Sequence, residues 1–227
     1  WRLHDNAFGV YDGEIVFEGQ EVVLETSTLA KKDFSYFRFF HFLQQFMWSK
    51  KWYSDYLIFL KSLGFHPVDV FDSIITRCRE KSGIIPDVYN EFMKDYGLES
   101  FETFEELKNF WKKDKNFSRL RSGDYGKLNM LYTYKVILEH REEFDKFILE
   151  IASEHLSKNN RQKSELVSIC SDILRFQSAR FVKIEDWKVR KEQLETFEFD
   201  ILSWRDSSKL ETDSFKKKVM YRFFIDE

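Results

Sequence analysis

The stretch Phe34–Phe59 reads FSYFRFFHFLQQFMWSKKWYSDYLIF, and it decides the fold because nearly every second residue in it is aromatic. Apolar side chains recur there at helical spacing on two faces, with Tyr36, Phe39, Phe40, Leu43, Phe46 and Met47 on one face and Phe34, Phe37 and Trp48 on the other. The pattern predicts a helix from about Lys31 to Trp48 that is buried on two sides. We expect one stripe to face the helix's own core and the other to face a neighbouring domain.

The composition is that of a folded protein with an unusual number of rings. Of the 227 residues, 43% are hydrophobic and 33% are charged, which argues against disorder. The net charge of −3 predicts neither a nucleic-acid-binding surface nor a strongly acidic partner. Because 18% of the residues are aromatic, we expect either a ring-filled core or a broad docking face.

The two cysteines, Cys78 and Cys170, lie far apart in helical contexts. Two cysteines without other ligands do not build a zinc or iron–sulfur site, and they do not resemble a secreted disulfide framework. A reducing cytoplasm is therefore the expected location. No apolar run approaches the length of a membrane span, so we expect no membrane partner.

The residues that open the chain carry strand and turn signals. Asp12-Gly13 is a strong turn dipeptide. Two short alternating segments, Glu14–Phe17 and Glu21–Glu25, predict a hairpin that turns at Glu18–Gln20. The chain begins directly with WRLHDNAFG at Trp1, and we interpret it as part of a longer polypeptide whose active site would lie upstream.

Apolar periodicity and the positions of glycine and proline predict further helices after the aromatic one. These are Tyr53–Leu63, His66–Lys81, Pro86–Tyr96, Phe104–Lys113, a long helix from a cap at Asp124 to Leu156, and Arg161–Phe176. The segment Asp114–Gly126 is expected to be irregular and basic. The long helix is expected to bury one face, made of Met130, Tyr134, Ile137, Phe144, Ile148 and Ile151.

The period changes from helical to alternating near the end of the chain. Phe197, Phe199 and Ile201 alternate with polar residues, and so do the apolar residues of Val219–Ile225. The predicted fold is therefore mainly α (α+β), a multi-helical domain with a short N-terminal β-hairpin and a C-terminal antiparallel β pair. We divide the chain into residues 1–29, an aromatic-rich helical domain at 30–157, and a helix with the β pair at 158–227.

The order of these features resembles the region that follows the catalytic barrel in cobalamin-binding-type radical S-adenosylmethionine proteins. The matching pieces are Tyr11-Asp12-Gly13, Glu14–Glu25, Thr28-Leu29, Asp33-Phe34 and the aromatic helix Phe37–Phe46. The resemblance covers at least residues 1–156. It implies a helical C-terminal region of unknown function whose partner is the upstream barrel of the same polypeptide.

The chain lacks the motifs that carry the chemistry of that family. It has neither the Cys-x3-Cys-x2-Cys loop that binds the cluster nor the Asp-x-His-x-x-Gly motif that binds cobalamin. The resemblance therefore implies that the 4Fe-4S cluster, S-adenosylmethionine and possible cobalamin belong to the parent protein. We assign no catalytic, cofactor-binding or metal residue, and expect no cofactor in these 227 residues.

The loop Arg119–Lys127 is basic, contains glycine and leads toward a helix N-terminus, where free amides can hold a phosphate. It lacks the spacing of a Walker loop, and Leu128 stands where a serine or threonine is required. We favour a simple turn followed by an Asp124 cap.

Other polar groups have an ordinary explanation beside a functional one. His4 and Asp5 could form an acid–base pair, but neighbours on a strand point to opposite faces, so Trp1–Asp5 is interpreted as a strand at the edge of a barrel. Glu139–Glu143 is expected to be a solvated helix face, and Lys216–Lys218 a charged edge strand. The five histidines, which show no metal-ligand spacing, are His4, His41, His66, His140 and His155, with His41 expected as a hydrogen-bonded packing residue.

Two hypotheses on function follow. The first is a non-catalytic accessory region that packs on the barrel or covers its substrate opening, and it predicts an exposed apolar face near Trp1 and the aromatic helix. The alternative is an independent helical module that binds protein or nucleic acid, and it predicts internal aromatics and a basic patch at Lys112–Lys127. A stand-alone enzyme is not favoured, because no triad, metal cluster or phosphate loop is found.

Overall fold

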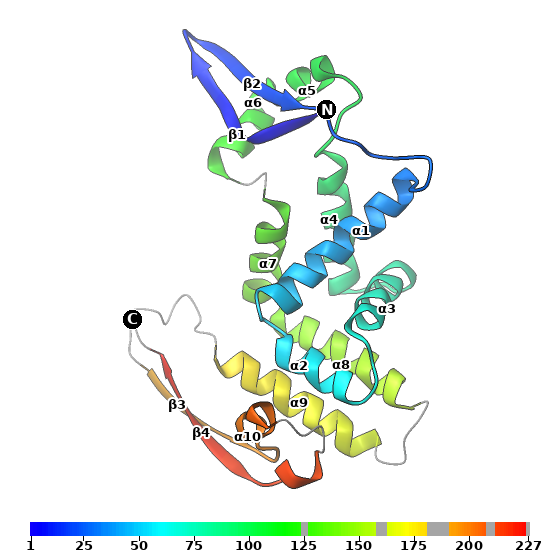
Figure 1. The fold of residues 1–227 in the computed structure, drawn as a ribbon. Helices are drawn as coiled ribbons and strands as arrows, with labels where there is room; N and C mark the ends of the chain where they lie inside the picture. The colour runs from blue at the N-terminus through cyan, green and yellow to red at the C-terminus, as the bar shows by residue number, and fades with distance from the viewer. Residues whose placement is uncertain (124–126, 158–162, 181–190, 208–211, 226–227) are drawn as a thin grey trace. The chain divides into compact units, whose positions relative to one another are not determined.

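The computed structural model describes residues 1–123, 127–157, 163–180, 191–207 and 212–225. The chain is 64% helical and carries a two-stranded antiparallel sheet near each end, which confirms the predicted fold class (Figure 1). It forms two compact units. The first is made of Trp1–Phe42 and Lys81–Glu139, and the second of Leu43–Glu80 and His140–Glu227. The division at 29/30 and 157/158 stays a prediction, because compactness does not show which segments fold independently.

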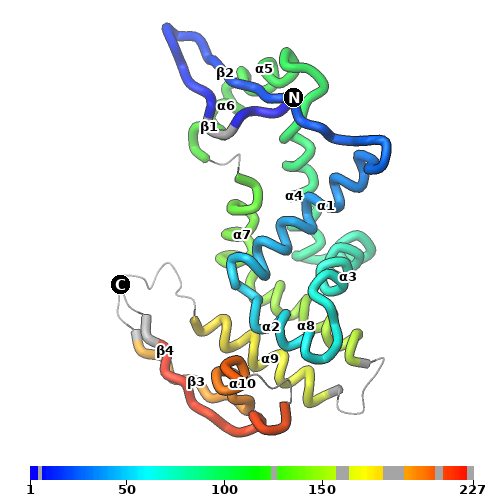
Figure 2. The backbone as a smooth tube through the Cα atoms, in the orientation of Figure 1, coloured from blue at the N-terminus to red at the C-terminus, as the bar shows by residue number. Residues whose placement is uncertain are grey.

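The described residues of the first unit form a hairpin and five helices. Their bounds are β1 (Arg2–Tyr11), β2 (Glu14–Gln20), α1 (Lys31–Leu43, whose last residue belongs to the second unit), α4 (Ile84–Gly97), α5 (Phe104–Trp111), α6 (Asp114–Ser122) and α7 (Leu128–Glu139). The hairpin lies beside α5 and α6, as the tube in Figure 2 shows. A shared hydrophobic cluster there includes Phe17, Leu107, Trp111, Phe117 and Leu120.

The hairpin turns earlier than the sequence predicted. Asp12 and Gly13 have φ of 50° and 84°, so they form the turn, and residues 21–25 are not a strand. The predicted turn at Glu18–Gln20 is therefore wrong. Gly19 lies in β2 against α5, where a Cβ would be 2.5 Å from Cε2 of Phe104. The absence of a side chain at residue 19 allows this close packing.

Helix α6 replaces the irregular segment that we expected at residues 114–126. It has few apolar residues, yet Phe117 and Leu120 are buried, and it ends at Gly123 in the left-handed conformation, with φ of 79°. Helix α5 begins as predicted at Thr103, whose hydroxyl accepts a hydrogen bond from Glu106 N–H in a capping box.

The predicted long helix is two helices, because the chain breaks at His140 before α8 (Arg141–Ser157). Phe144, Ile148 and Ile151 of α8 are buried as predicted. The face predicted for α7 is wrong: its buried residues are Leu128, Tyr132 and Val136, whereas Met130 and Tyr134 are exposed. A break in the helix resets the direction in which each face points, so one periodic pattern across both helices fails.

The second unit contains the remaining elements. Their bounds are the π-helix η1 (Gln44–Ser49), α2 (Ser54–Ser62), α3 (Pro67–Glu80), α8, α9 (Lys163–Ala179), β3 (Lys191–Phe197), α10 (Ile201–Asp206), the 3-10 turn η3 (Asp213–Phe215) and β4 (Val219–Ile225). The aromatic helix thus changes at Gln44 from α to π geometry, which the sequence did not predict. Lys50 N–H donates to Gln45 C=O at 2.8 Å, five residues back.

The C-terminal β pair is confirmed, with β3 antiparallel to β4. Its first strand ends sooner than predicted, because Asp200 begins α10 and accepts a hydrogen bond from Ser203 N–H at 3.1 Å. Phe199 and Ile201 are therefore outside the strand, although both are buried. The sheet packs on α9, where the Phe176 ring lies 5.9 Å from that of Phe197.

The aromatic stretch supplies rings to both cores. In the first unit the Phe39 ring is 4.8 Å from Tyr89 and 5.0 Å from Phe92. In the second, the Phe46 ring is 5.3 Å from Tyr53 and 5.4 Å from Phe144. Within the first unit, the Arg38 guanidinium holds Glu99 through two hydrogen bonds of 3.2 and 3.3 Å and also donates to Asn129.

We predict that Gly19→Ala destabilises the protein by about 1 kcal/mol or more, because the new methyl group forces the Phe104 ring away from its place. The measurement is urea unfolding. Gly97→Ala is the matched control: no atom lies within 4 Å of its added Cβ, and Gly97 is the last residue of α4. The control is expected to be neutral or more stable by about 0.5 kcal/mol. Equal effects of the two changes would contradict the close packing.

Candidate functional site

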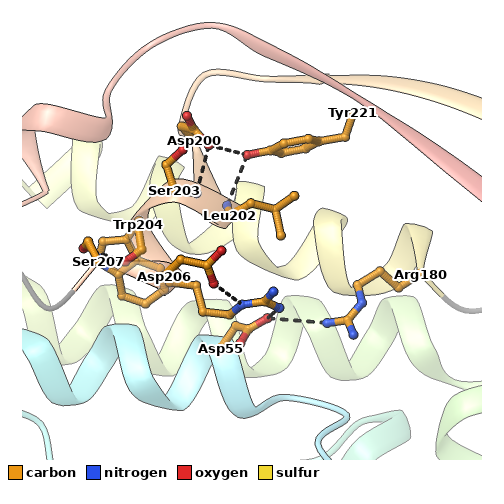
Figure 3. A network of polar contacts seen from close by, with 10 residues as sticks. Asp55, Arg180, Asp200, Leu202, Ser203, Trp204, Asp206, Ser207 and Tyr221 are labelled. Carbon is orange, nitrogen blue, oxygen red and sulfur yellow. Dashed lines mark hydrogen bonds and ion pairs between the residues drawn. The ribbon is translucent and has the colours of Figure 1, made fainter.

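A polar network in the second unit lies where β4 meets α10. Asp200 accepts hydrogen bonds from Tyr221 Oη at 2.6 Å and Ser203 N–H at 3.1 Å (Figure 3). Its other oxygen is 2.8 Å from Lys217 Nζ. Burial raises the pKa of Asp200, but the hydrogen bonds from Lys217, Tyr221 and Ser203 outweigh it and hold the pKa far below its usual range. The carboxylate therefore stays ionised and acts as a fixed acceptor.

Tyr221 completes this network from β4. Its hydroxyl donates to Asp200 and accepts from Leu202 N–H at 3.1 Å, so one side chain joins the strand to the start of α10. Burial, followed by the hydrogen bond to Asp200, raises the pKa of Tyr221 to about 12. A tyrosine that stays protonated at neutral pH and is bonded on both sides serves structure better than acid–base chemistry.

A cleft of about 290 Å³ lies next to the network. It is lined by Glu165, Ser168, Ile169, Asp172, Glu198, Phe199 and Lys216–Lys218. Lys216 contacts Glu165 at 2.8 Å, and Asp172 holds Arg175 at 2.9 Å. Lys216–Lys218 precede β4 instead of lying on it, so the predicted charged edge strand is wrong; the three lysines pair with carboxylates.

A second buried carboxylate, Asp55 of α2, is only 3% exposed. Its Oδ2 is 3.7 Å from Arg180 Nη1 and 3.9 Å from Arg205 Nη1, and it has no hydrogen-bond partner among the described residues (Figure 3). Burial raises the pKa of Asp55, and the two guanidiniums offset this only in part. No sequence motif predicts this cluster, because its members are far apart in the chain.

A third polar pair joins the buried Tyr53 to the partly buried Asp145 through a 2.8 Å hydrogen bond. Burial raises the pKa of Asp145 to about 6, and the hydrogen bond from Tyr53 lowers it in part. The pKa of Tyr53 is raised by burial and by the nearby Asp145 charge. Asp145 therefore titrates near pH 6, well above an ordinary aspartate.

The histidines do not form a catalytic or metal-binding group in the described part of the chain. His155 Nε2 is 2.9 Å from Ser73 Oγ, but Ser73 donates its own proton to Asp69 C=O at 2.7 Å. The imidazole must then be the donor, so it does not activate the hydroxyl. His41 is exposed on α1, which corrects the expected packing role. No group of three or more possible metal ligands occurs among the described residues.

The other sequence candidates are not brought together. Arg119–Ser122 end α6 and Lys127 precedes α7, while the Asp124 cap lies outside the described residues. His4 is exposed on β1, and the side chain of Asp5 is likewise outside them. The Trp1 ring packs 5.2 Å from Phe104. Glu139–Glu143 spans the junction of α7 and α8 and is not one continuous helix face.

The thiols of Cys78 and Cys170 are free and buried. Burial raises the pKa of each to about 12, so neither is a reactive thiolate at neutral pH.

Exposed apolar side chains form a row on one helix of the first unit. Met130, Tyr134 and Leu138 of α7 recur every four residues and are 45%, 51% and 51% exposed. Further exposed apolar residues of this unit are Val10, Tyr11 and Val16 on the hairpin, Val23, Phe37 on α1 and Ile84 on α4. The alternative hypothesis required internal aromatics, and the exposed rings of Tyr11, Phe37 and Tyr134 do not agree with it.

Comparison with known proteins adds no identification: no family model, curated protein or solved structure matches the chain. Within the described residues, none of the helices has both the length and the apolar character needed to cross a membrane.

We predict that Asp145→Asn flattens the pH dependence of stability. The folded-state pKa of about 6 exceeds the value of about 4 in the unfolded chain, so the wild-type protein loses about 3 kcal/mol of stability as pH rises from about 4 to about 6, and its stability then levels off. Asparagine keeps an acceptor for Tyr53 and does not ionise. Urea unfolding across this pH range measures the effect, with exposed Asp69→Asn as control. An unchanged slope in Asp145→Asn would show that this carboxyl is not the source.

Tyr221→Phe is expected to destabilise the protein by about 1–3 kcal/mol, because it leaves Leu202 N–H without its acceptor and removes a bond to Asp200. Thermal unfolding gives the comparison. Tyr134→Phe removes the same hydroxyl from an exposed position and is expected to change stability by less than about 0.5 kcal/mol. Similar losses in both variants are the result that the network does not allow.

Proposed function

We propose that the chain is a non-catalytic accessory region that docks onto a catalytic domain. The observation that carries the proposal is the row Met130, Tyr134 and Leu138 on α7, about half exposed although aligned on one helix face. Contiguous exposed apolar side chains commonly mark docking surfaces, since leaving them in water is unfavourable. The exposed Phe37 of the aromatic helix supports the same interpretation.

The family resemblance supplies the partner in this proposal. It is the upstream barrel of a cobalamin-type radical S-adenosylmethionine enzyme, which would hold the 4Fe-4S cluster, S-adenosylmethionine and possible cobalamin in the cytoplasm. The accessory region would pack on the barrel or cover its substrate opening. Three polar groups support this division of roles, because Asp200, Ser73 and Asp172 are engaged in structural contacts.

The first test is the product of the complete reading frame that contains this chain. Purified without oxygen, supplied with iron and sulfide and then reduced with dithionite, it should bind about four irons and cleave S-adenosylmethionine to methionine and 5′-deoxyadenosine. A reading frame that starts close to Trp1, or one without a three-cysteine cluster loop upstream, would refute the proposed parent enzyme.

Docking is tested separately in the same full-length protein. The triple variant Met130→Ser, Tyr134→Ser, Leu138→Ser should increase protease cleavage just before Trp1 while leaving the helical content unchanged, because it removes the proposed contact. Val68→Ser combined with Met220→Ser is the control, since both residues are exposed and apolar and lie in the second unit. Equal cleavage of the two variants would rule out α7 as the docking face.

One observation favours the alternative, an independent module that binds nucleic acid. Lys112, Lys113, Lys115 and Arg121 are exposed at the end of α5 and along α6. Binding to this patch would weaken steeply with added salt, since each neutralised phosphate releases counterions. Salt-dependent binding of RNA or DNA that persists in the α7 triple variant would favour the module over the accessory region.

A further inference from the structure

Two arginines in the second unit approach one buried carboxylate without forming a hydrogen bond to it. Arg180, just after α9, and Arg205, on α10, are 3.7 and 3.9 Å from the same Oδ2 of Asp55. Their side chains are 46% and 35% exposed, whereas that of Asp55 is 5% exposed. Each guanidinium has five N–H donors, so most of the donors at this point remain available to solvent.

The other cations nearby are used differently. Lys217 is 2.8 Å from Asp200, and Arg175 donates to Asp172 and to Thr196 C=O at 2.9 and 3.0 Å. These charges are held by short contacts. Arg180, in contrast, lies over the Phe176 ring at 5.9 Å, and Arg205 Nε is 3.7 Å from the exposed carboxylate of Asp206. Among the described cations of this region, Arg180 and Arg205 therefore approach one carboxylate oxygen only at 3.7 and 3.9 Å, and neither forms a hydrogen bond to it.

We propose that Arg180 and Arg205 bind an oxyanion, a phosphate-type ion or a carboxylate group, that bridges the two guanidiniums. Planar guanidinium groups match the paired oxygens of such anions and form two parallel hydrogen bonds with them. Two arginines from different elements that meet at one carboxylate provide the converging donors that this recognition needs. Neither the sequence motifs nor the proposed docking function requires this site.

Binding at this site is coupled to a proton on Asp55. The groups that face it are the cations of Arg180 and Arg205, and Asp206 lies beyond Arg205. An anion that is bound by the two guanidiniums weakens their electrostatic attraction for the carboxylate of Asp55. The cost of keeping Asp55 charged then rises, so its carboxyl takes up a proton from solvent as the anion binds. Affinity for an anion of constant charge must therefore increase as pH falls.

The test titrates the whole 227-residue chain with sulfate by calorimetry at constant ionic strength. Arg180→Gln and Arg205→Gln should each weaken binding by about tenfold, the loss expected for removing charge-assisted hydrogen bonds. Arg180→Lys keeps the charge but loses the paired N–H donors of the guanidinium, so it should reduce sulfate affinity by an intermediate amount. Arg222→Gln, an exposed cation paired with Glu192, is the charge-matched control and should bind normally.

The proton coupling has its own readout. Sulfate affinity of the wild-type chain should rise as the pH is lowered from neutral, with proton uptake seen as buffer-dependent heat, and Asp55→Asn should remove both effects. Circular dichroism confirms that each variant is folded. Competition with inorganic phosphate against a peptide with a free carboxyl terminus distinguishes a free ion from a partner's carboxylate. Absence of saturable binding, or equal loss in Arg222→Gln, overturns the site.

Discussion

Burial of the rings in Phe34–Phe59 is the constraint on which the rest of the fold depends. The stretch belongs to both compact units, since the boundary falls between Phe42 and Leu43. Its first half contributes Phe39 and Phe42 to the core of one unit, and its second half contributes rings such as Phe46 to the other. Each ring removes a large apolar area from water, so replacing these residues would weaken the core that each half supports.

This dependence explains the geometry within the stretch. A regular α-helix places residues three and four apart on one face, whereas the π segment Gln44–Ser49 inserts an extra residue into the turn and shifts the faces that follow. Phe46 and Met47 are fully buried beyond that shift. The apolar residues of the stretch are thus divided between the two units along the helix. Phe37, which belongs to the second stripe, lies in the first unit and is exposed.

The sequence predicted the type of most elements correctly, but it predicted helix breaks and turns poorly. Helix starts set by local chemistry, such as the Thr103 capping box and Pro67, were found because neighbouring residues determine them. The helix break at His140 contains no glycine or proline, so no local helix-breaking residue predicted it. The hairpin was misplaced for a different reason: alternation extends past Gln20 and suggested a turn at Glu18–Gln20, whereas the strands pair across the local turn at Asp12-Gly13.

The candidate sites were beyond sequence reasoning because charge pairing is a property of the fold. Lys216–Lys218 look like a basic run, yet carboxylates from α9 and the β3–α10 segment neutralise them. Arg180 and Arg205 look like isolated cations, yet they meet over Asp55. A basic residue can bind a ligand only to the extent that its hydrogen bonds are not already satisfied. The short ion pairs therefore stabilise the fold, whereas the proposed anion site lies where two arginines contact a buried carboxylate only at 3.7 and 3.9 Å.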